Sequence, residues 1–111
     1  MSEEICEVII TAPEPTWLTD FVRQLVEDRL CAGSHTSAEV RSIYRWQGEV
    51  FDRSEARVAL HTRLTLVPLI VDRANHEHPY EVPCVVAVPM VAGNPAYMQW
   101  VLDETTAPAE T

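Results

Sequence analysis

HPYEVPCVVAVP, residues 78–89, joins a polar group of side chains directly to an apolar segment. Its first two prolines favour an extended backbone, because proline fixes its own φ and disfavours helical geometry in the residue before it. Residues 82–88 are rich in β-branched side chains and predict a strand buried on both faces of a sheet that helices cover. His78, Tyr80 and Glu81 place an imidazole, a phenol and a carboxylate at the start of this strand. We therefore expect a functional site to include this segment.

A long β-hairpin is predicted upstream of that segment. Residues 40–46 and 56–63 each alternate between two kinds of side chain, and Gln47-Gly48 forms a turn between the two arms. The segment 52–55 is polar, so the outer half of the hairpin is expected to project beyond the core. Aromatic side chains in that half need a cover, and a second copy of the chain is the simplest one. These aromatic residues are Tyr44, Trp46 and Phe51.

The N-terminal part of the chain predicts one strand followed by one helix. Residues 5–11 are rich in β-branched side chains and favour the strand. Apolar residues then recur at helical spacing. Thr16 is expected to cap the start of this helix, and Gly33 is expected to end it.

The remaining elements complete a known arrangement. Thr65 is expected to cap a second helix over residues 66–75, and Asn94 and Pro95 are expected to start a short last helix. The predicted order is therefore strand–helix–strand–strand–helix–strand with one added helix. This order is typical of the α+β ferredoxin-like sandwich, in which both helices cover one face of an antiparallel sheet. We predict that residues 1–111 form a single domain of this kind.

The composition limits the classes of partner that the chain is expected to bind. The chain has 8 basic and 17 acidic residues and a formal net charge of −9, which argues against nucleic-acid binding because that needs a basic surface. No apolar run reaches the roughly 20 residues that span a membrane, and the acidic N-terminus lacks the features of a signal peptide. We expect a cytoplasmic protein that binds neither nucleic acid nor membrane. Cys6, Cys31 and Cys84 are expected to be buried thiols.

Motifs typical of catalysis do not occur in the sequence. There is no GxSxG nucleophile elbow and no P-loop. The chain has only 3 glycines, which leaves little material for a loop that binds phosphate. We expect no enzymatic activity.

His76, His78 and Glu81 are the candidate metal ligands. Imidazole nitrogens and carboxylate oxygens suit copper, zinc and similar divalent ions. The two histidines are two residues apart, so they converge only on an extended backbone, and neither HExxH nor CxxC accompanies them. The alternative is a polar helix end whose histidines bind water and backbone, with incidental uptake of Cu²⁺ or Zn²⁺.

A second candidate site is a ligand cleft formed by aromatic and basic side chains. The alternative is that the aromatic rings fill the core and a subunit interface, where burying each contributes roughly 2–3 kcal/mol. The candidate residues for the cleft are Arg41, Tyr44, Trp46, His61, Tyr80, Tyr97 and Trp100.

Five features of the sequence stand in a characteristic order and spacing: SIYRWQGE (42–49), TR (62–63), HPYEVP (78–83), GNPAY (93–97) and Trp100. In this order and spacing they resemble the motifs of the CutA family, the divalent-cation tolerance proteins. The resemblance extends from Ile5 to about Asp103. It implies a ferredoxin-like subunit and a tight homotrimer in which the hairpins extend strand pairing between subunits. It also implies a role in tolerance to copper or other divalent cations. We expect that no metal is required for folding.

The resemblance leaves the mode of action open. The trimer of this family is similar to the PII signalling proteins, so one alternative is a sensor that binds an anionic small molecule in the clefts between subunits. Another is a structural trimer that docks on a protein partner through its hairpins. The metal constellation implied by the resemblance joins a first-strand cysteine to the His78 segment. This chain has Ile10 at the place of that cysteine, and isoleucine cannot be a ligand.

Overall fold

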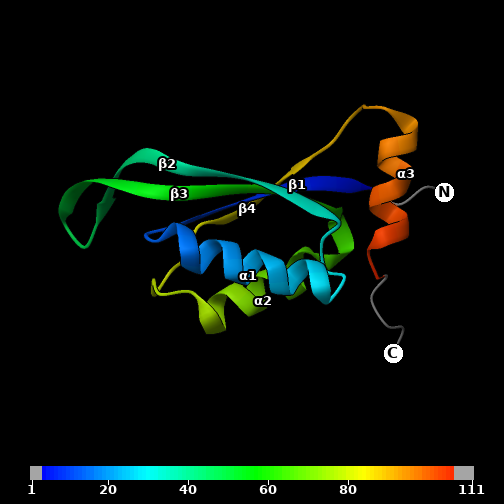
Figure 1. Cartoon of the computed structure of the whole chain (residues 1–111). Coiled ribbons are helices and arrows are strands. Elements are labelled where there is room, and N and C mark those ends of the chain that lie inside the picture. Colours follow the sequence, from blue (N-terminus) through cyan, green and yellow to red (C-terminus); the bar gives the residue numbers. More distant parts are fainter. Residues whose placement is uncertain (1–3, 107–111) are drawn as a thin grey trace.

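The structure, a computed structural model, describes residues 4–106. The strands are β1 (Ile5–Ala12), β2 (Gly33–Trp46), β3 (Glu49–Arg63) and β4 (Val85–Pro89), and the helices are α1 (Pro15–Glu27), η1 (Leu64–Leu66), α2 (Val67–Glu77) and α3 (Pro95–Glu104). The strands form one antiparallel sheet in the order β2-β3-β1-β4. Figure 1 shows α1 and α2 together beneath one face of this sheet, and α3 at its end. The predicted ferredoxin-like fold is confirmed.

The main core lies between the sheet and the helices α1 and α2. Alternate residues of β1 point toward the helices and are fully buried, Val8 and Ile10 among them. Leu18 and Leu25 of α1 and Ile70 of α2 meet them and are also 0% exposed. The period of two in the strand and the apolar stripe of the helix thus supply the two sides of one core.

β2 and β3 form the predicted long hairpin, whose outer half extends beyond the helices (Figure 1). Gln47 and Gly48 have φ values of 50° and 82°, and Trp46 pairs with Glu49 across them. Positive φ at both central residues defines a type I′ turn, whose twist matches that of the flanking strands. The register shifts between residues 37 and 40, so an irregularity separates the inner half of the hairpin from the projecting half.

The prediction that residues 82–88 form a doubly buried strand is wrong. β4 begins at Val85 and pairs with β1 alone, so it is an edge strand. Its Ala87 packs against the main core, whereas Val86 and Val88 are each 50% exposed. An apolar run indicates a strand but does not distinguish a central strand from an edge strand with one face uncovered in the single chain.

The starts of α1 and α2 differ from the prediction. α1 begins at Pro15, with Glu14 instead of Thr16 at the N-cap position, because proline is well tolerated in the first turn, where its missing N–H has no helical partner. Thr65 lies inside the short 3₁₀ turn η1, and Leu66 takes the N-cap position of α2. The 3₁₀ turn therefore displaces the start of α2 by one residue from the predicted position.

The end of α1 also differs, since it does not use a glycine. The helix ends at Glu27 because Arg29 adopts a left-handed conformation with φ of 63°. The N–H of Leu30 then donates to the carbonyl oxygen of Leu25 at 2.8 Å, which is the bond of a Schellman cap. Gly33, predicted to end this helix, is instead the first residue of β2.

α3 is built as predicted and has its own small core. The side chain of Asn94 accepts a hydrogen bond from the N–H of Ala96 at 3.0 Å, and Pro95 is the first helical residue. Val101 is fully buried and clusters with Ile5. Within residues 4–106, no helix has the length and apolar character needed to cross a membrane.

Candidate functional site

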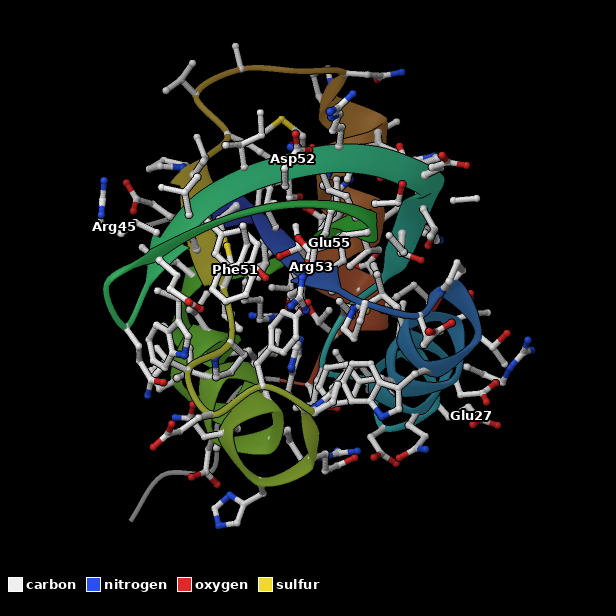
Figure 2. The ribbon with its side chains drawn as sticks, turned by 90° about the vertical axis from the view of Figure 1, so that its left-hand side faces the viewer. Glu27, Arg45, Phe51, Asp52, Arg53 and Glu55 are labelled. Atoms are coloured by element: carbon white, nitrogen blue, oxygen red, sulfur yellow. The ribbon has the colours of Figure 1, made fainter. Side chains whose placement is uncertain are left out.

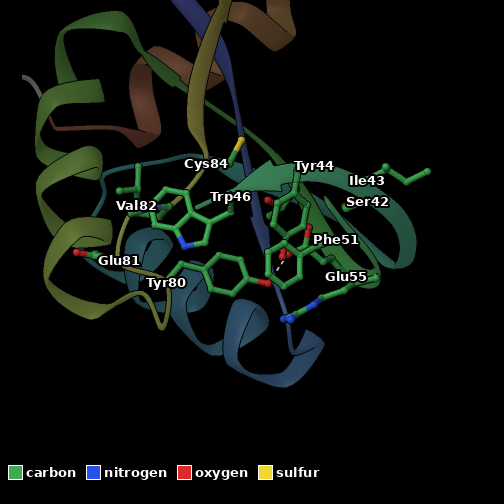
Figure 3. Close-up of a pocket in the computed structure, with 13 residues that line it drawn as sticks. Ser42, Ile43, Tyr44, Trp46, Phe51, Glu55, Tyr80, Glu81, Val82 and Cys84 are labelled. Atoms are coloured by element: carbon green, nitrogen blue, oxygen red, sulfur yellow. Dashed lines mark hydrogen bonds between the residues drawn. The ribbon is translucent and has the colours of Figure 1, made fainter. Parts of the chain in front are cut away.

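A pocket of about 680 Å³ lies between the outer half of the hairpin and the segment that precedes β4. Tyr44, Trp46 and Phe51 line it from the hairpin, and Tyr80 faces them from the opposite wall (Figure 3). The volume is within the range of about 300–1,000 Å³ typical of small-molecule sites. The charged and sulfur-containing side chains of the lining are Arg53, Glu55, Glu81 and Cys84.

Strand geometry gathers these rings on one wall. Side chains two residues apart share a face of a strand, which puts Tyr44 and Trp46 together on β2. Phe51 of β3 is the register partner of Tyr44, and the two rings stack with centroids 5.4 Å apart. Figure 2 shows Phe51, Arg53 and Glu55 beneath the hairpin, on the side of the helices. The inward face of the projecting hairpin is therefore aromatic and carries one cation and one anion.

Glu55 is a buried acidic side chain in this pocket. It is 5% exposed, and its Oε2 accepts a hydrogen bond from the Tyr80 hydroxyl at 2.5 Å (dashed in Figure 3). Burial raises the pKa of Tyr80 well above its usual value, and the bond to Glu55 raises it further, so the phenol stays protonated and donates. Across residues 4–106, no basic side chain forms an ion pair with Glu55.

His78 is held by two backbone groups at the base of the same segment. It is 8% exposed; its Nε2 donates to the carbonyl oxygen of Thr11 at 2.7 Å, and its Nδ1 accepts from the N–H of Tyr80 at 2.9 Å. A backbone N–H can only donate, so Nδ1 is unprotonated and the ring proton is on Nε2. Burial also lowers the pKa of His78. The ring is therefore neutral, and both of its nitrogens are engaged.

The three predicted metal ligands are not assembled into a metal centre. His76 is exposed, with Nδ1 2.8 Å from the carbonyl oxygen of Asp72, and Figure 3 shows the Glu81 carboxylate pointing away from the rings. His78 has no free nitrogen lone pair. In the described part of the chain, no three His, Cys, Asp or Glu side chains are grouped so as to hold a metal ion. These residues do not fit a preformed divalent site, which needs several converging donors.

The seven residues predicted for a ligand cleft are distributed over three places. Tyr44, Trp46 and Tyr80 line the pocket together. Arg41 does not line it, and instead forms a two-point pair with the carboxylate of Asp52, in which both contacts are 2.7 Å. That pair is exposed, so it organises the outer surface of the hairpin and not the pocket.

The other three residues lie around α3, at the end of the sheet opposite the hairpin tip (Figure 1). Tyr97 contacts His61 through a hydrogen bond, and His61 in turn contacts Glu7 on β1. The rings of Tyr97 and Trp100 are 5.4 Å apart. This cluster joins α3 to the sheet.

Several residues that line the pocket, Phe51, Arg53 and Glu55 among them, are not among the predicted site residues. Phe51, Arg53 and Glu55 follow each other at intervals of two, which is the signal that they share a face; their polar surroundings suggest solvent instead. The prediction that Cys84 is buried is wrong, because it is exposed at the pocket. It precedes the edge strand β4, which has no neighbour on its outer side.

The other two cysteines are buried, as predicted. Burial raises the pKa of Cys6 to about 11 and that of Cys31 to about 12. These thiols stay protonated at neutral pH and lie in the core, so they take no part in the pocket.

Comparison with known sequences gives consistent matches over most of the chain. The family model described as CutA1 divalent ion tolerance protein matches residues 6–104. The divalent-cation tolerance protein CutA of Thermus thermophilus is 37% identical over 98 residues, which are 88% of this chain and 95% of that protein. Human protein CutA is 33% identical over 107 residues, 96% of this chain and 60% of that protein. The chain thus spans 55–60% of the mouse and human relatives.

Solved structures match equally well. The divalent cation tolerance protein of Thermus thermophilus superimposes with a TM-score of 0.88 at 35% identity, covering 92% of this chain and 99% of that one. CutA1 of the psychrotrophic bacterium Shewanella sp. SIB1 superimposes with a TM-score of 0.89 at 28% identity, covering 96% and 100%. The length and placement of the elements are therefore shared along nearly the whole chain.

Proposed function

The chain belongs to the CutA1 divalent ion tolerance family, and on this premise we propose that it is a homotrimeric binding protein that acts in divalent-cation tolerance without chemistry of its own. The observation that carries the proposal is the family match over residues 6–104. The name of the Thermus thermophilus relative, which this chain covers almost completely, supports the same role.

Uncovered apolar side chains support the assembly. Ile43 and Val50 of the hairpin are 66% and 62% exposed, and Val86 and Val88 of the edge strand are each 50% exposed. Exposed apolar surface on a projecting hairpin and on an edge strand is typical of surfaces that associate. A second and third copy of the chain can cover these residues through symmetric contacts.

The proposed mode of action is regulation by binding, and not storage of metal in a preformed site. His76, His78 and Glu81 remain the proposed contacts for Cu²⁺ or another divalent cation. They are not converged, and both ring nitrogens of His78 bind backbone groups. Uptake of an ion at His78 therefore has to compete with these bonds, which disfavours tight chelation.

The role is tested in a copper-sensitive bacterial strain that lacks its own relative of this chain. Expression of the chain is expected to restore growth at a copper concentration that stops the strain, and a lack of any growth difference contradicts the role. Calorimetric titration of Cu²⁺ into the wild type, His78→Ala and His76→Ala then distinguishes specific metal binding from regulation. A stoichiometric site lost with His78 indicates metal binding, whereas weak, unchanged uptake in all three supports regulation.

A second candidate function is a sensor of a small organic molecule, favoured by one observation. The pocket beside the hairpin has aromatic walls and few charged groups, which is the usual make-up of small-molecule sites. A thermal-shift screen of metabolites tests this candidate, since a ligand that binds only the folded state raises the unfolding temperature.

A further inference from the structure

We propose that the pocket beneath the hairpin binds a small organic monocation, a quaternary or alkylated ammonium group, between its aromatic rings and the carboxylate of Glu55. The inference rests on the second candidate function, the small-molecule sensor, and specifies its class of ligand; it is separate from the role in divalent-cation tolerance. All the groups that it uses come from one chain.

The aromatic walls of the pocket are suited to a cation. The face of an aromatic ring attracts a cation that lies within about 6 Å of its centroid. Tyr44, Trp46 and Phe51 line the pocket from the hairpin, and Tyr80 faces them (Figure 3). One cation of the protein already uses such a ring, since Cζ of Arg53 lies 4.6 Å from the centroid of Phe51. One ring of this pocket, on which Tyr44 also stacks, therefore already contacts a cationic group of the protein.

The carboxylate of Glu55 is available as the partner of a bound cation. Glu55 is 5% exposed, and Tyr80 donates only to its Oε2. Among residues 4–106, none donates a hydrogen bond to Oε1 and none forms an ion pair with Glu55. The carboxylate is largely removed from water, although its Oε1 is not a fully buried, unpaired atom. A cation bound beside it offsets the cost of that partial desolvation.

The sign of the lining charges agrees with this assignment. The pocket is lined by one cationic side chain, Arg53, and by two anionic ones, Glu55 and Glu81. An anionic ligand placed between the rings would face the buried carboxylate of Glu55. A cation placed there is complementary to it.

The chemistry of the lining selects an organic cation over a metal ion. A divalent ion replaces its hydration shell with several oxygen or nitrogen donors. In the described part of the chain, no three such acidic, His or Cys groups converge. Aromatic walls cannot replace water around a metal, but they make good contacts with the methyl groups of a quaternary ammonium.

The test compares choline with its uncharged isostere, the alcohol in which a tert-butyl group replaces the trimethylammonium. Both are titrated into the full chain by calorimetry. The two ligands have the same shape, so the difference reports the charge alone. Choline is expected to bind at least about tenfold more tightly, the effect of a cation–π contact reinforced by a carboxylate. Equal affinities, or no binding of choline, overturn the proposal.

Two variants locate the site, with a third as control. Glu55→Gln keeps an acceptor for Tyr80 but removes the charge, and is expected to weaken choline binding about tenfold. Arg53→Gln removes the cation that competes for Phe51 and is expected to strengthen binding a few-fold, a gain that misfolding cannot mimic. Arg41→Gln, outside the pocket, is expected to leave the affinity unchanged. The site is wrong if Glu55→Gln folds and binds choline as the wild type does, or if Arg53→Gln weakens binding.

The same samples distinguish this inference from the proposed function. Oligomeric state and restoration of growth under copper are measured for Glu55→Gln beside choline binding. Loss of choline binding with both other properties intact is the expected result. If choline does not bind while the wild type assembles and restores growth, only the proposed ammonium site is refuted.

Discussion

The hydroxyl of Tyr97 lies 2.5 Å from Nδ1 of His61, and Nε2 of the same ring lies 2.9 Å from the carboxylate of Glu7. Both ring nitrogens of His61 are therefore engaged, one by the Tyr97 hydroxyl and the other by the Glu7 carboxylate. The His61 side chain is 14% exposed, which shields these bonds from water. Three elements, α3, β3 and β1, are thereby tied together at the end of the sheet.

Replacing Tyr97 by Phe is expected to lower the free energy of unfolding by about 1 kcal/mol, because the hydrogen bond between the Tyr97 hydroxyl and His61 is lost while the ring packing is kept. Urea unfolding at one fixed protein concentration measures this change. Gln99→Ala on the same helix removes only an exposed hydrogen bond to Asp103 and is expected to change stability by less than about 0.5 kcal/mol. Equal stability of Tyr97→Phe and the wild type contradicts the role of this chain of bonds.

A matched pair of leucines tests the placement of the core. Leu18 on α1 is fully buried, whereas Leu69 on α2 is 46% exposed. Leu18→Ala leaves a cavity and is expected to cost about 3 kcal/mol. Leu69→Ala is expected to cost less than about 1 kcal/mol, since much of that side chain already contacts water. Similar losses for the two variants, measured by chemical denaturation, speak against this orientation of the helices.

The sequence is sufficient to predict the fold because each element carries a local signal. The alternation in β1, the stripe of Leu18 and Leu25, and the Gln47-Gly48 turn each predict a structure that the chain adopts. The end of α1 is not predictable in this way. Arg29 takes the left-handed position usually occupied by glycine, and no residue type at this point of the sequence indicates a left-handed conformation.

Only part of the pocket is predictable from the sequence, and the reason is not the same as for the end of α1. The aromatic residues Tyr44, Trp46 and Tyr80 stand out by type as candidates for a ligand cleft. Glu55 does not, because burial of a carboxylate depends on the curvature of the hairpin over the segment before β4, which is a tertiary property. The same limit applies to β4, whose position at the sheet edge is set by topology and not by its own residues.

Acid pH is expected to destabilise the protein through His78. Burial lowers the pKa of the folded ring below its ordinary 6.5, so the unfolded chain takes up the proton first. The stability that His78 contributes is therefore present above about pH 6.5 and is lost as the pH falls toward the folded pKa, with a slope of up to about 1.4 kcal/mol per pH unit. His78→Gln is expected to flatten this part of the curve, and exposed His76→Gln to leave it unchanged. A His78→Gln profile parallel to that of the wild type refutes the assignment.

Alkaline pH is expected to destabilise the protein through Cys31. Its folded pKa is raised by burial from 9.0 to about 12, so above about pH 9 the unfolded thiol ionises while the folded one does not. Its contribution is complete below pH 9 and is lost as the pH rises toward 12. Under reducing conditions, Cys31→Ala is expected to show a smaller loss of stability between about pH 8 and pH 10. Exposed Cys84→Ala is the control, and an unchanged slope in Cys31→Ala is the contrary result.

The proposed function depends on assembly of the chain into a homotrimer. The exposed valines of β4 and the projecting hairpin are the features that support this assembly. Light scattering coupled to size exclusion, at micromolar concentration and without added metal, measures it most directly. We predict a single species with three times the subunit mass of 12.5 kDa. A stable species of 12.5 kDa contradicts the account.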